Sequence, residues 1–200
     1  IGVDQKRFIP FGKIWQGKTK ICLQGELLVL TVCRLEPRKD INTLLVAAKI
    51  LQKEKLCFVV AGTGIDEAKL KIKSKKLKLR NFHFLDFVSD EDLPALYRAA
   101  NLFVLPTLEE GFGIVLIEAM ASGVPVLSNS VGAVPEVLDG VGTIIPPLKP
   151  KLLAENILQI LSSPKSQNSM IKRGLKLVQE RYNWDKIISQ YEKAYQDVAK

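Results

Sequence analysis

The stretch that decides the fold is ELLVLTVCRLEPRKDINTLLVAAKILQKEKLCFVVAG, residues 26–62. It opens with a continuous apolar run over residues 26–35, which is the pattern of a β-strand buried on both faces. A run of helical period follows over residues 40–54, with Asp40 placed as its N-cap. A second buried strand follows over residues 56–62. A strand, a helix and a strand in this order predict a right-handed crossover unit of a parallel sheet.

The same alternation continues along the chain. Further strands are expected over 81–87, 101–106, 124–129 and 141–146, and further helices over 69–80, 89–100, 113–122, 134–139 and from Pro150 onward. Ser89 is expected to cap one of these helices and Gly123 to end another. We therefore predict an α/β fold, a doubly wound parallel sheet of about six strands in the Rossmann-like arrangement, with C-terminal helices. Such sheets bind ligands at the carboxyl ends of their strands, so functional residues are expected just after the strands.

The composition is that of one soluble domain. The chain has 200 residues, of which 47% are hydrophobic and 25% charged, and this length suits a single domain with a substantial core. No apolar run reaches the roughly 18 residues that a membrane span needs, and no signal peptide opens the chain. The first residue is Ile1 rather than Met, which suggests a fragment of a longer protein.

The cysteines and the single histidine point to packing rather than chemistry. Cys22, Cys33 and Cys57 show no C-x-x-C or Cys/His spacing, so reduced structural thiols in a cytoplasmic protein are expected. His83 alternates with phenylalanines along a predicted strand, which favours a packed strand residue over a catalytic base. A lone histidine also argues against a His-based triad or a zinc site.

The net charge of +8 concentrates in KLKIKSKKLKLR, residues 69–80. On a helix, one face would carry Lys69, Lys73, Lys76 and Arg80. A solvated helix face is the favoured interpretation, and attraction to an anionic membrane or partner is the alternative. No nucleic-acid motif or aromatic interleaving is present, so no nucleic-acid partner is expected.

Cations follow the first predicted strand. Arg34 and Lys39 lie in one loop, CRLEPRKD. Two cations at the carboxyl edge of a parallel sheet can hold a diphosphate, because arginine offers a planar fork of donors and lysine a point charge. Ordinary surface charge is the alternative for this loop taken alone.

The loops after the next two strands give weaker signals. Gly62 and Gly64 permit close backbone approach to a ligand, and a tight turn explains them equally well. Their spacing is not G-x-G-x-x-G, and no P-loop is present, which argues against a nicotinamide or P-loop nucleotide site. Asp90 and Asp92 spell D-x-D, but both open a predicted helix, where the dipole favours acids. No metal site is therefore expected.

The stretch EEGFGIVLIEAM, residues 109–120, carries the strongest candidates. Gly111 and Gly113 would let backbone N–H groups face an anion or sugar hydroxyls at a helix N-terminus. Glu110 sits in the loop beside such a ligand. Glu118 lies in a helix of apolar residues, where an unpaired acid would be costly. A carboxylate accepting two hydrogen bonds from a vicinal diol such as a ribose explains Glu118 better than a solvent-exposed acid does.

These motifs carry a family resemblance. EGFGIVLIEAMASGVPVL resembles the E-x7-E signature of family 4 retaining glycosyltransferases, with Glu110 and Glu118 as its acids. IGVDQKRFIP resembles the N-G-V-D-x-x-x-F-x-P segment that opens their C-terminal half, and CRLEPRKD resembles their G-R-L-x-x-x-K loop. VSDEDLPALYRAANLFVLPTLEEGFG and SVGAVPEVL follow the family pattern, and ERYNWDKIISQYEKAY resembles its closing helices. The resemblance covers nearly the whole chain.

The resemblance implies a GT-B architecture, in which two Rossmann-like domains enclose the active site. The chain, 1–200, would be the nucleotide-sugar-binding domain, with residues about 1–25 arriving from a missing N-terminal domain and residues about 165–200 forming closing helices. Such an enzyme moves a hexose from an NDP-sugar, with UDP or GDP expected, to a glycan or lipid-linked acceptor, with retention and without metal or cofactor. A cytoplasmic location, with peripheral contact at the inner face of an anionic membrane, is also expected.

Residue roles carry over position by position. As catalytic residues, Arg34 and Lys39 would hold the diphosphate and stabilise it as leaving group, and Glu110 would contact the donor sugar near the reacting centre. Glu118 would hold the ribose hydroxyls. Backbone near Phe87 and Val88 would meet the base. The remaining expected substrate-binding residues are Gly62, Gly64, Gly111, Phe112, Gly113, Ile114 and Val115.

The chain departs from the family pattern at four positions, none of which removes a charged ligand group. They are Cys33, Asp86 and Ala133, where glycine is usual, and Asn101, where aspartate is usual. Two alternatives to a transferase domain follow from the same fold: a non-catalytic nucleotide-sugar-binding module and a sugar-nucleotide epimerase of GT-B fold. The intact Arg34, Lys39, Glu110 and Glu118 argue against a degenerate site.

Overall fold

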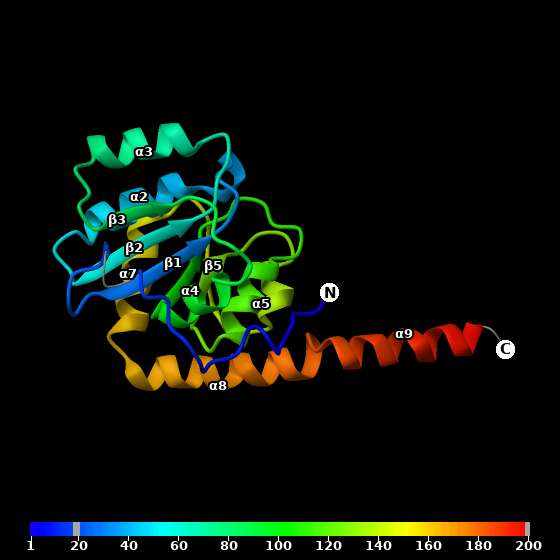
Figure 1. The fold of residues 1–200 in the computed structure, drawn as a ribbon. Helices are drawn as coiled ribbons and strands as arrows, with labels where there is room; N and C mark the ends of the chain where they lie inside the picture. The colour runs from blue at the N-terminus through cyan, green and yellow to red at the C-terminus, as the bar shows by residue number, and fades with distance from the viewer. Residues whose placement is uncertain (18–20, 199–200) are drawn as a thin grey trace.

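The computed structural model describes residues 1–17 and 21–198, in which a six-stranded sheet lies between layers of helices (Figure 1). The strands are β1 (Leu27–Val32), β2 (Leu56–Ala61), β3 (Phe82–Leu85), β4 (Leu102–Leu105), β5 (Val126–Asn129) and β6 (Thr143–Ile145). Every pairing between them is parallel, and their order in space is β3-β2-β1-β4-β5-β6. The predicted doubly wound parallel sheet is confirmed.

Helices cover both faces of this sheet. One face carries α2 (Ile41–Ile50), α3 (Glu67–Lys76) and α7 (Pro150–Leu161), and the other carries α4 (Leu93–Ala99), α5 (Ile114–Ala121), α6 (Val134–Leu138) and α8 (Pro164–Arg181). The strands are mostly apolar because they lie between two cores. In β1, Leu28 and Leu30 belong to the core under α4 and α5, whereas Val29 belongs to the core under α2 and α7.

The C-terminal part of the chain is helical, as predicted. After α8, the helix α9 (Trp184–Val198) runs on away from the body of the domain (Figure 1). It contributes no buried residue. Across the described ranges, none of the helices combines the length and the apolar character required to cross a bilayer.

The order of the strands creates a switch point between β1 and β4, which are neighbours in the sheet. The loop after β1 leads through the 3-10 turn η1 (Pro37–Lys39) to α2 on one face, and the loop after β4 leads to α5 on the other. Loops that part in this way leave a crevice at the carboxyl ends of the strands, which is where such sheets bind ligands.

Of two predicted N-caps, the structure confirms one and not the other. Asp40 does cap α2, since its side chain accepts a hydrogen bond from the Thr43 N–H. The helix predicted from Ser89, however, begins only at Leu93. The Ser89 hydroxyl instead accepts from the Asp92 N–H at 3.2 Å, in a turn that precedes α4.

The basic segment 69–80 does not form the four-cation helix face predicted for it. The helix α3 ends at Lys76, and Lys78 has a left-handed φ of 55°, so Arg80 lies outside the helix. Some of the lysines also have partners within the domain. The Lys73 ammonium donates a hydrogen bond to the side-chain oxygen Oδ1 of Asn42 at 2.8 Å. The Lys71 ammonium lies 2.7 Å from a Glu67 carboxylate oxygen.

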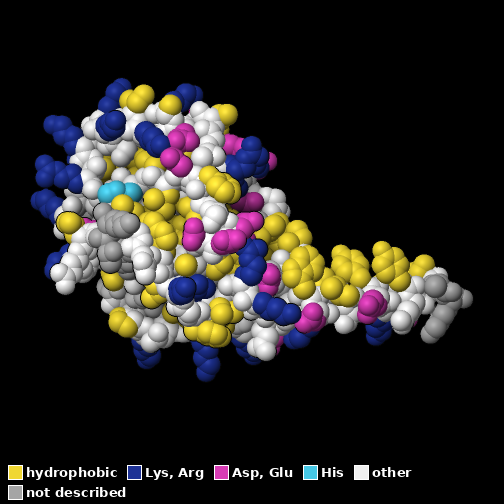
Figure 2. Space-filling view, viewed as in Figure 1, with side chains coloured by type: hydrophobic (Ala, Val, Ile, Leu, Met, Phe, Trp, Pro, Cys, Tyr) yellow, Lys and Arg dark blue, Asp and Glu magenta, His cyan; other side chains and the backbone are white. Residues whose placement is uncertain are grey.

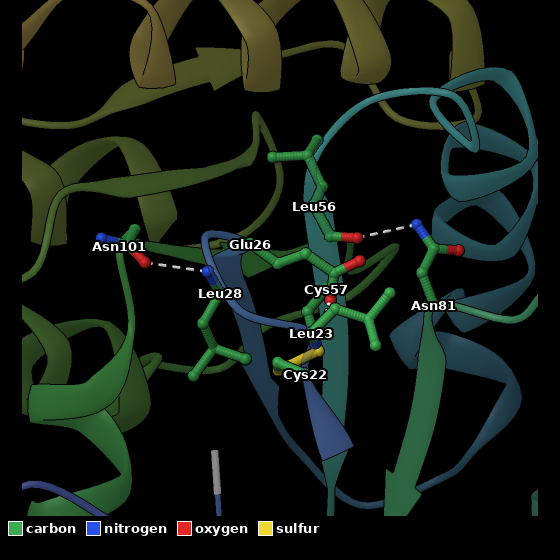
Figure 3. Close-up of a disulfide and its surroundings, with 8 residues drawn as sticks. All are labelled: Cys22, Leu23, Glu26, Leu28, Leu56, Cys57, Asn81 and Asn101. Atoms are coloured by element: carbon green, nitrogen blue, oxygen red, sulfur yellow. Dashed lines mark hydrogen bonds between the residues drawn. A yellow bond between two sulfur atoms is a disulfide. The ribbon is translucent and has the colours of Figure 1, made fainter. Parts of the chain in front are cut away.

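The prediction of three reduced cysteines is wrong. Cys22 and Cys57 form a disulfide that ties the segment before β1 to the start of β2 (Figure 3). The sequence hid this pairing because the two residues are 35 positions apart and Cys22 belongs to no predicted element. The inference of a reducing compartment therefore loses its support. Cys33 is the free cysteine, and burial raises the pKa of its thiol to about 12, which keeps it protonated and unreactive.

Candidate functional site

A cavity of about 400 Å³ opens where β1, β2 and β3 end. Five of the predicted site residues line it together: Arg34, Gly62, Gly64, Phe87 and Val88. They come from three loops that are far apart in the sequence and meet because parallel strands end at the same edge. Asp90 also lines the cavity. The sequence marked it only as half of a D-x-D pair.

The two glycines of the cavity are required by the packing of the chain against itself. A Cβ on Gly62 would lie 2.0 Å from the Cys33 carbonyl oxygen, and one on Gly64 would lie 2.3 Å from the Leu35 carbonyl oxygen. The loops after β1 and β2 also exchange backbone hydrogen bonds, such as Leu35 N–H to the Thr63 carbonyl at 2.9 Å. The sequence offered a close approach to a ligand or a tight turn as the reason for these glycines, and the geometry gives a different one, the packing of this loop against the loop after β1.

Arg34 presents its guanidinium to the cavity and to solvent. Its side chain is 78% exposed, and its Nε lies 3.0 Å from a Glu36 carboxylate oxygen. The hydrogen bond from Arg38, together with the charge of Arg34, lowers the pKa of Glu36. Because Glu36 contacts Arg34 through Nε, the terminal nitrogens of Arg34 keep donors available for an anion in the cavity.

Lys39 and Glu110, both predicted to be catalytic, meet each other across the switch point. The Lys39 ammonium lies 2.6 Å from a Glu110 carboxylate oxygen, and the two side chains are only 10% and 12% exposed. The loops that carry them are joined by a hydrogen bond from the Leu108 N–H to the Arg38 carbonyl at 2.7 Å. An ammonium has three N–H donors, so one contact with Glu110 leaves two for a further ligand.

The segment after β5 holds the loop that carries Glu110 by backbone contacts. A Cβ on Gly132 would lie 2.0 Å from the Glu110 carbonyl oxygen, and Gly132 has a φ of +49°. The Ala133 N–H donates to the same carbonyl at 3.3 Å. The stretch SVGAVPEVL, residues 130–138, thus supports the backbone of Glu110.

The N-terminus of α5 has an open side. Nothing lies within 4 Å of a Cβ placed on Gly111, and Gly113 is the N-cap of α5 with a φ of 84°. Ile114 is 45% exposed, whereas Val115 packs against the core. The Phe112 ring packs edge-on against the Tyr182 ring, with 6.2 Å between ring centroids. Only the backbone of Phe112 remains a candidate for ligand contact.

Glu118 is half-buried and hydrogen-bonded, so it is not the solvent-exposed acid that the sequence left as an alternative. The Tyr97 hydroxyl donates to a Glu118 carboxylate oxygen at 2.8 Å, and Tyr97 is fully buried. Burial raises the pKa of Glu118, while the hydrogen bond from Tyr97 and the charge of Arg7 lower it. The sequence missed Tyr97 because helical spacing does not reveal contacts between different helices.

Replacing Glu118 with glutamine is expected to stabilise the domain at neutral pH and to leave its stability at about pH 4 unchanged. The wild-type carboxyl has a raised pKa in the folded state, so its contribution to stability is present below the unfolded value of 4.5 and is lost as pH rises through the folded value. Glutamine can still accept from Tyr97 and does not titrate.

Thermal unfolding of both chains between pH 4 and 8 measures this difference. The melting temperature of Glu118→Gln should rise above that of the wild type progressively with pH. A difference that is constant over the whole range would contradict the buried, titrating carboxylate described above.

The D-x-D pair shows no metal-site geometry. Asp92 accepts from the Ser89 hydroxyl at 3.0 Å, and both aspartates are exposed. Within residues 1–17 and 21–198, a cluster of potential metal ligands is formed by Cys22, Glu26 and Cys57, but both of its sulfurs belong to the disulfide (Figure 3). Catalysis without a metal stays a prediction.

Six parallel strands in this order, with the ion pair Lys39–Glu110 over the switch point, define a Rossmann-like α/β domain. The family model described as glycosyl transferases group 1 matches residues 18–177. The chain belongs to the group 1 glycosyl transferase family. The family membership indicated by the sequence motifs is therefore confirmed.

Several curated relatives of similar sequence are named as mannosyltransferases. The O-antigen chain mannosyltransferase B of Escherichia coli is 32% identical over 183 residues, which is 89% of this chain and 47% of the relative. The MMP alpha-(1->4)-mannosyltransferase of Mycolicibacterium hassiacum is 29% identical, over 100% of this chain and 48% of the relative. The chain spans about half the length of these relatives.

Solved structures share the fold. The C-terminal domain of a glycosyl transferase group 1 family protein from Francisella tularensis superposes with a TM-score of 0.80 at 27% identity, covering 92% of this chain and 100% of that one. Anabaena HepE, solved in complex with UDP-glucose, superposes with a TM-score of 0.88 at 20% identity, covering 98% of this chain and 56% of that one. At that identity the second likeness is one of fold.

Proposed function

We propose that the chain is the donor-binding domain of a retaining, metal-independent glycosyltransferase, which moves a hexose from an NDP-sugar to a glycan or lipid-linked acceptor. The main support for the proposal is the cavity at the ends of β1, β2 and β3. Arg34 and Cys33 line it, and Cys33 lies close enough to Lys39 and Glu110 for their charges to act on its thiol. The mannosyltransferase names of the relatives and the UDP-glucose bound to HepE support a sugar nucleotide as donor.

The arrangement of charges suits the cleavage of a glycosyl–phosphate bond. Breaking this bond builds negative charge on the diphosphate and positive charge on the sugar. The exposed guanidinium of Arg34 and the two remaining donors of Lys39 would stabilise the departing diphosphate in place of a metal. The Glu110 carboxylate, which Lys39 holds in place, would face the positive charge on the sugar.

The proposed mechanism requires no protein nucleophile. The acceptor hydroxyl attacks from the face that the diphosphate leaves, and its proton passes to the departing phosphate oxygen, so the configuration is retained. This scheme suits a chain whose one histidine, His83, lies on β3. The Glu118 carboxylate would accept hydrogen bonds from the ribose, and Phe87, which is 78% exposed in the cavity, would lie beside the base.

Replacing Arg34 with alanine is expected to weaken the binding of UDP or GDP by about 10- to 100-fold, because hydrogen bonds from a charged donor contribute about 1.5–3 kcal/mol. Arg38→Ala is the matched control, since Arg38 lies in the same loop, contacts the same Glu36 and does not line the cavity. Isothermal titration calorimetry measures both. Equal losses in the two variants would show a general effect of charge and contradict the assignment of Arg34.

We propose that the N-terminal domain of the longer enzyme packs against the exposed face of α9. Five large side chains recur at intervals of four and three residues along it: Trp184, Ile188, Tyr191, Tyr195 and Val198. Each is between 45% and 86% exposed, and Figure 2 shows hydrophobic side chains along the helix where it leaves the body. Aromatic and aliphatic stripes of this kind are typical of interfaces.

Hydrogen exchange tests this interface. In the longer protein, the α9 amides should exchange more slowly than in the 200-residue chain. Equal exchange rates of the α9 amides in the two proteins would contradict the proposed interface.

Contact between α3 and the anionic cytoplasmic face of a membrane is a separate proposal. Lys75 and Lys76 at the end of α3 are exposed. The domain should therefore co-sediment with phosphatidylglycerol vesicles at low salt and be released at high salt, where surface attraction is screened. Absence of co-sedimentation at low salt would rule this contact out.

A further inference from the structure

A buried hydroxyl group lies beneath the loop that carries Glu110. It belongs to Thr107, which follows β4 and has no exposed surface. Its Oγ1 lies 2.7 Å from the Glu109 carbonyl oxygen and 3.1 Å from the Arg38 carbonyl oxygen. Glu109 immediately precedes Glu110, and Arg38 immediately precedes Lys39. One hydroxyl therefore joins the backbone at the two places where the residues of the buried ion pair are attached.

The Arg38 carbonyl receives two hydrogen bonds from the loop after β4. Besides the Thr107 hydroxyl, it accepts from the Leu108 N–H at 2.7 Å. A carbonyl oxygen has two lone pairs, so both bonds form at once. The loop after β1 is thus bound to the loop after β4 by two consecutive residues, one through its side chain and one through its backbone.

Thr107 is itself fixed by the sheet. Its carbonyl accepts from the Asn129 side-chain amide at 2.9 Å, and Asn129, at the end of β5, is only 2% exposed. Its N–H donates to the Leu105 carbonyl at 3.0 Å, at the end of β4. A threonine side chain has few rotamers because it is branched at Cβ. The position of the hydroxyl is therefore set by β4 and β5, and through it the position of both loops.

The ion pair that these loops carry is sensitive to small displacements. The Lys39 ammonium lies 2.6 Å from the Glu110 carboxylate, and both side chains are almost buried. Charges in such surroundings interact strongly, and the energy changes steeply with their separation. The same displacement would move the two remaining Lys39 donors away from a diphosphate. A misplacement of about 1 Å in a catalytic site is enough to cost much of the rate.

We infer that Thr107 is a positioning residue of the donor site, whose hydroxyl holds Lys39 and Glu110 at the separation that the ligand requires. The inference rests on the proposed function for its ligand, but not for the coupling between the two charged side chains. It gives a role to a buried polar group that touches neither the cavity nor the charged atoms of the pair.

A double-mutant cycle measures the coupling without any ligand. The free energy of unfolding is compared for the wild type, Lys39→Met, Glu110→Leu and the double variant, and the cycle is repeated in a Thr107→Val background. Valine keeps the shape of threonine and lacks the hydroxyl. The coupling between Lys39 and Glu110 should be smaller in that background, and a Thr107→Ser background, which keeps the hydroxyl, should restore it. An unchanged coupling in Thr107→Val would overturn the inference.

Thr31→Val is the matched control. Thr31 is also fully buried, and its hydroxyl donates to the Val104 carbonyl at 2.7 Å, which joins β1 to β4 within the sheet. This variant should lower the stability much as Thr107→Val does, but leave the coupling between Lys39 and Glu110 unchanged. An equal loss of coupling in both backgrounds would show a general effect of stability and overturn the positioning role.

Thr107→Ala provides a second variant that lacks the hydroxyl. It places no methyl group beside the two carbonyls, so the test does not depend on how well valine is tolerated at this position. The loss of coupling should be the same as in Thr107→Val. A full wild-type coupling in Thr107→Ala would also overturn the inference.

Calorimetry with UDP and GDP tests the consequence for binding. Thr107→Val should bind the nucleotide about 3- to 10-fold more weakly than the wild type, which is the effect of one hydrogen bond. Thr107→Ser and Thr31→Val should bind as the wild type does. Equal affinity of Thr107→Val and the wild type would overturn the role in donor binding. If the wild type binds neither nucleotide, the proposed function fails, while the double-mutant cycle still decides whether Thr107 positions the ion pair.

Discussion

The Lys39→Met variant is expected to lose about 4 kcal/mol of unfolding free energy, because removing one partner of a buried ion pair strands the other charge. Lys39 and Glu110 have side chains that are only 10% and 12% exposed, so water cannot replace the lost ammonium. For a domain of this size, the melting temperature should fall by roughly 10 °C. Chemical denaturation and thermal unfolding both measure the change.

A second variant separates this effect from a general loss of packing. Lys39→Met/Glu110→Leu removes both charges and should recover most of the lost stability, because apolar replacements of a buried pair are often neutral or better. Lys71→Met provides a control, since Lys71 is 40% exposed in its ion pairs. It should change the stability by at most about 1 kcal/mol. A double variant no more stable than Lys39→Met would contradict the account of the pair.

Loss of the disulfide is expected to cost about 4 kcal/mol. Cys22 and Cys57 close a loop with a sequence separation of 35, and the chain-entropy estimate for a loop of that length gives this value. The domain should therefore melt roughly 10 °C lower when a thiol reductant is present. Cys22→Ala/Cys57→Ala should melt at the lower temperature with or without the reductant.

Cys33→Ala is the control for this experiment. Cys33 is the free cysteine of the chain, so this variant should keep the full response to the reductant. If the reductant leaves the melting temperature of the wild type unchanged, the disulfide has no part in stability under the conditions of the test.

The order and type of the elements followed from the sequence because burial leaves a plain pattern. β2 is buried at all six of its positions, and its residues, LCFVVA, form an uninterrupted apolar run. Helix ends were predicted less well. The start of α4 depends on a local bond between Ser89 and Asp92, and the end of α3 on the left-handed backbone of Lys78. Neither leaves a periodic signal.

The candidate site was predictable where it depends on topology alone. Arg34, Gly62 and Phe87 follow three neighbouring strands, so their meeting in one cavity follows from the parallel sheet. The side-chain contacts that position the acids of the site could not be predicted from the sequence. Lys39 and Glu110 are 71 residues apart, and Tyr97 and Glu118 are 21 apart on different helices. These contacts depend on side-chain directions across the packed fold, which spacing along the sequence does not encode.

We propose above all that this domain binds the nucleotide part of a sugar donor without a metal. Calorimetric titration of the folded chain with UDP, GDP and ADP, in the presence of EDTA, tests it most directly. We predict that UDP or GDP binds weakly, that EDTA leaves the affinity unchanged, and that Arg34→Ala and Glu118→Gln each reduce it. Absence of binding by all three nucleotides, with the fold shown to be intact, would contradict the claim.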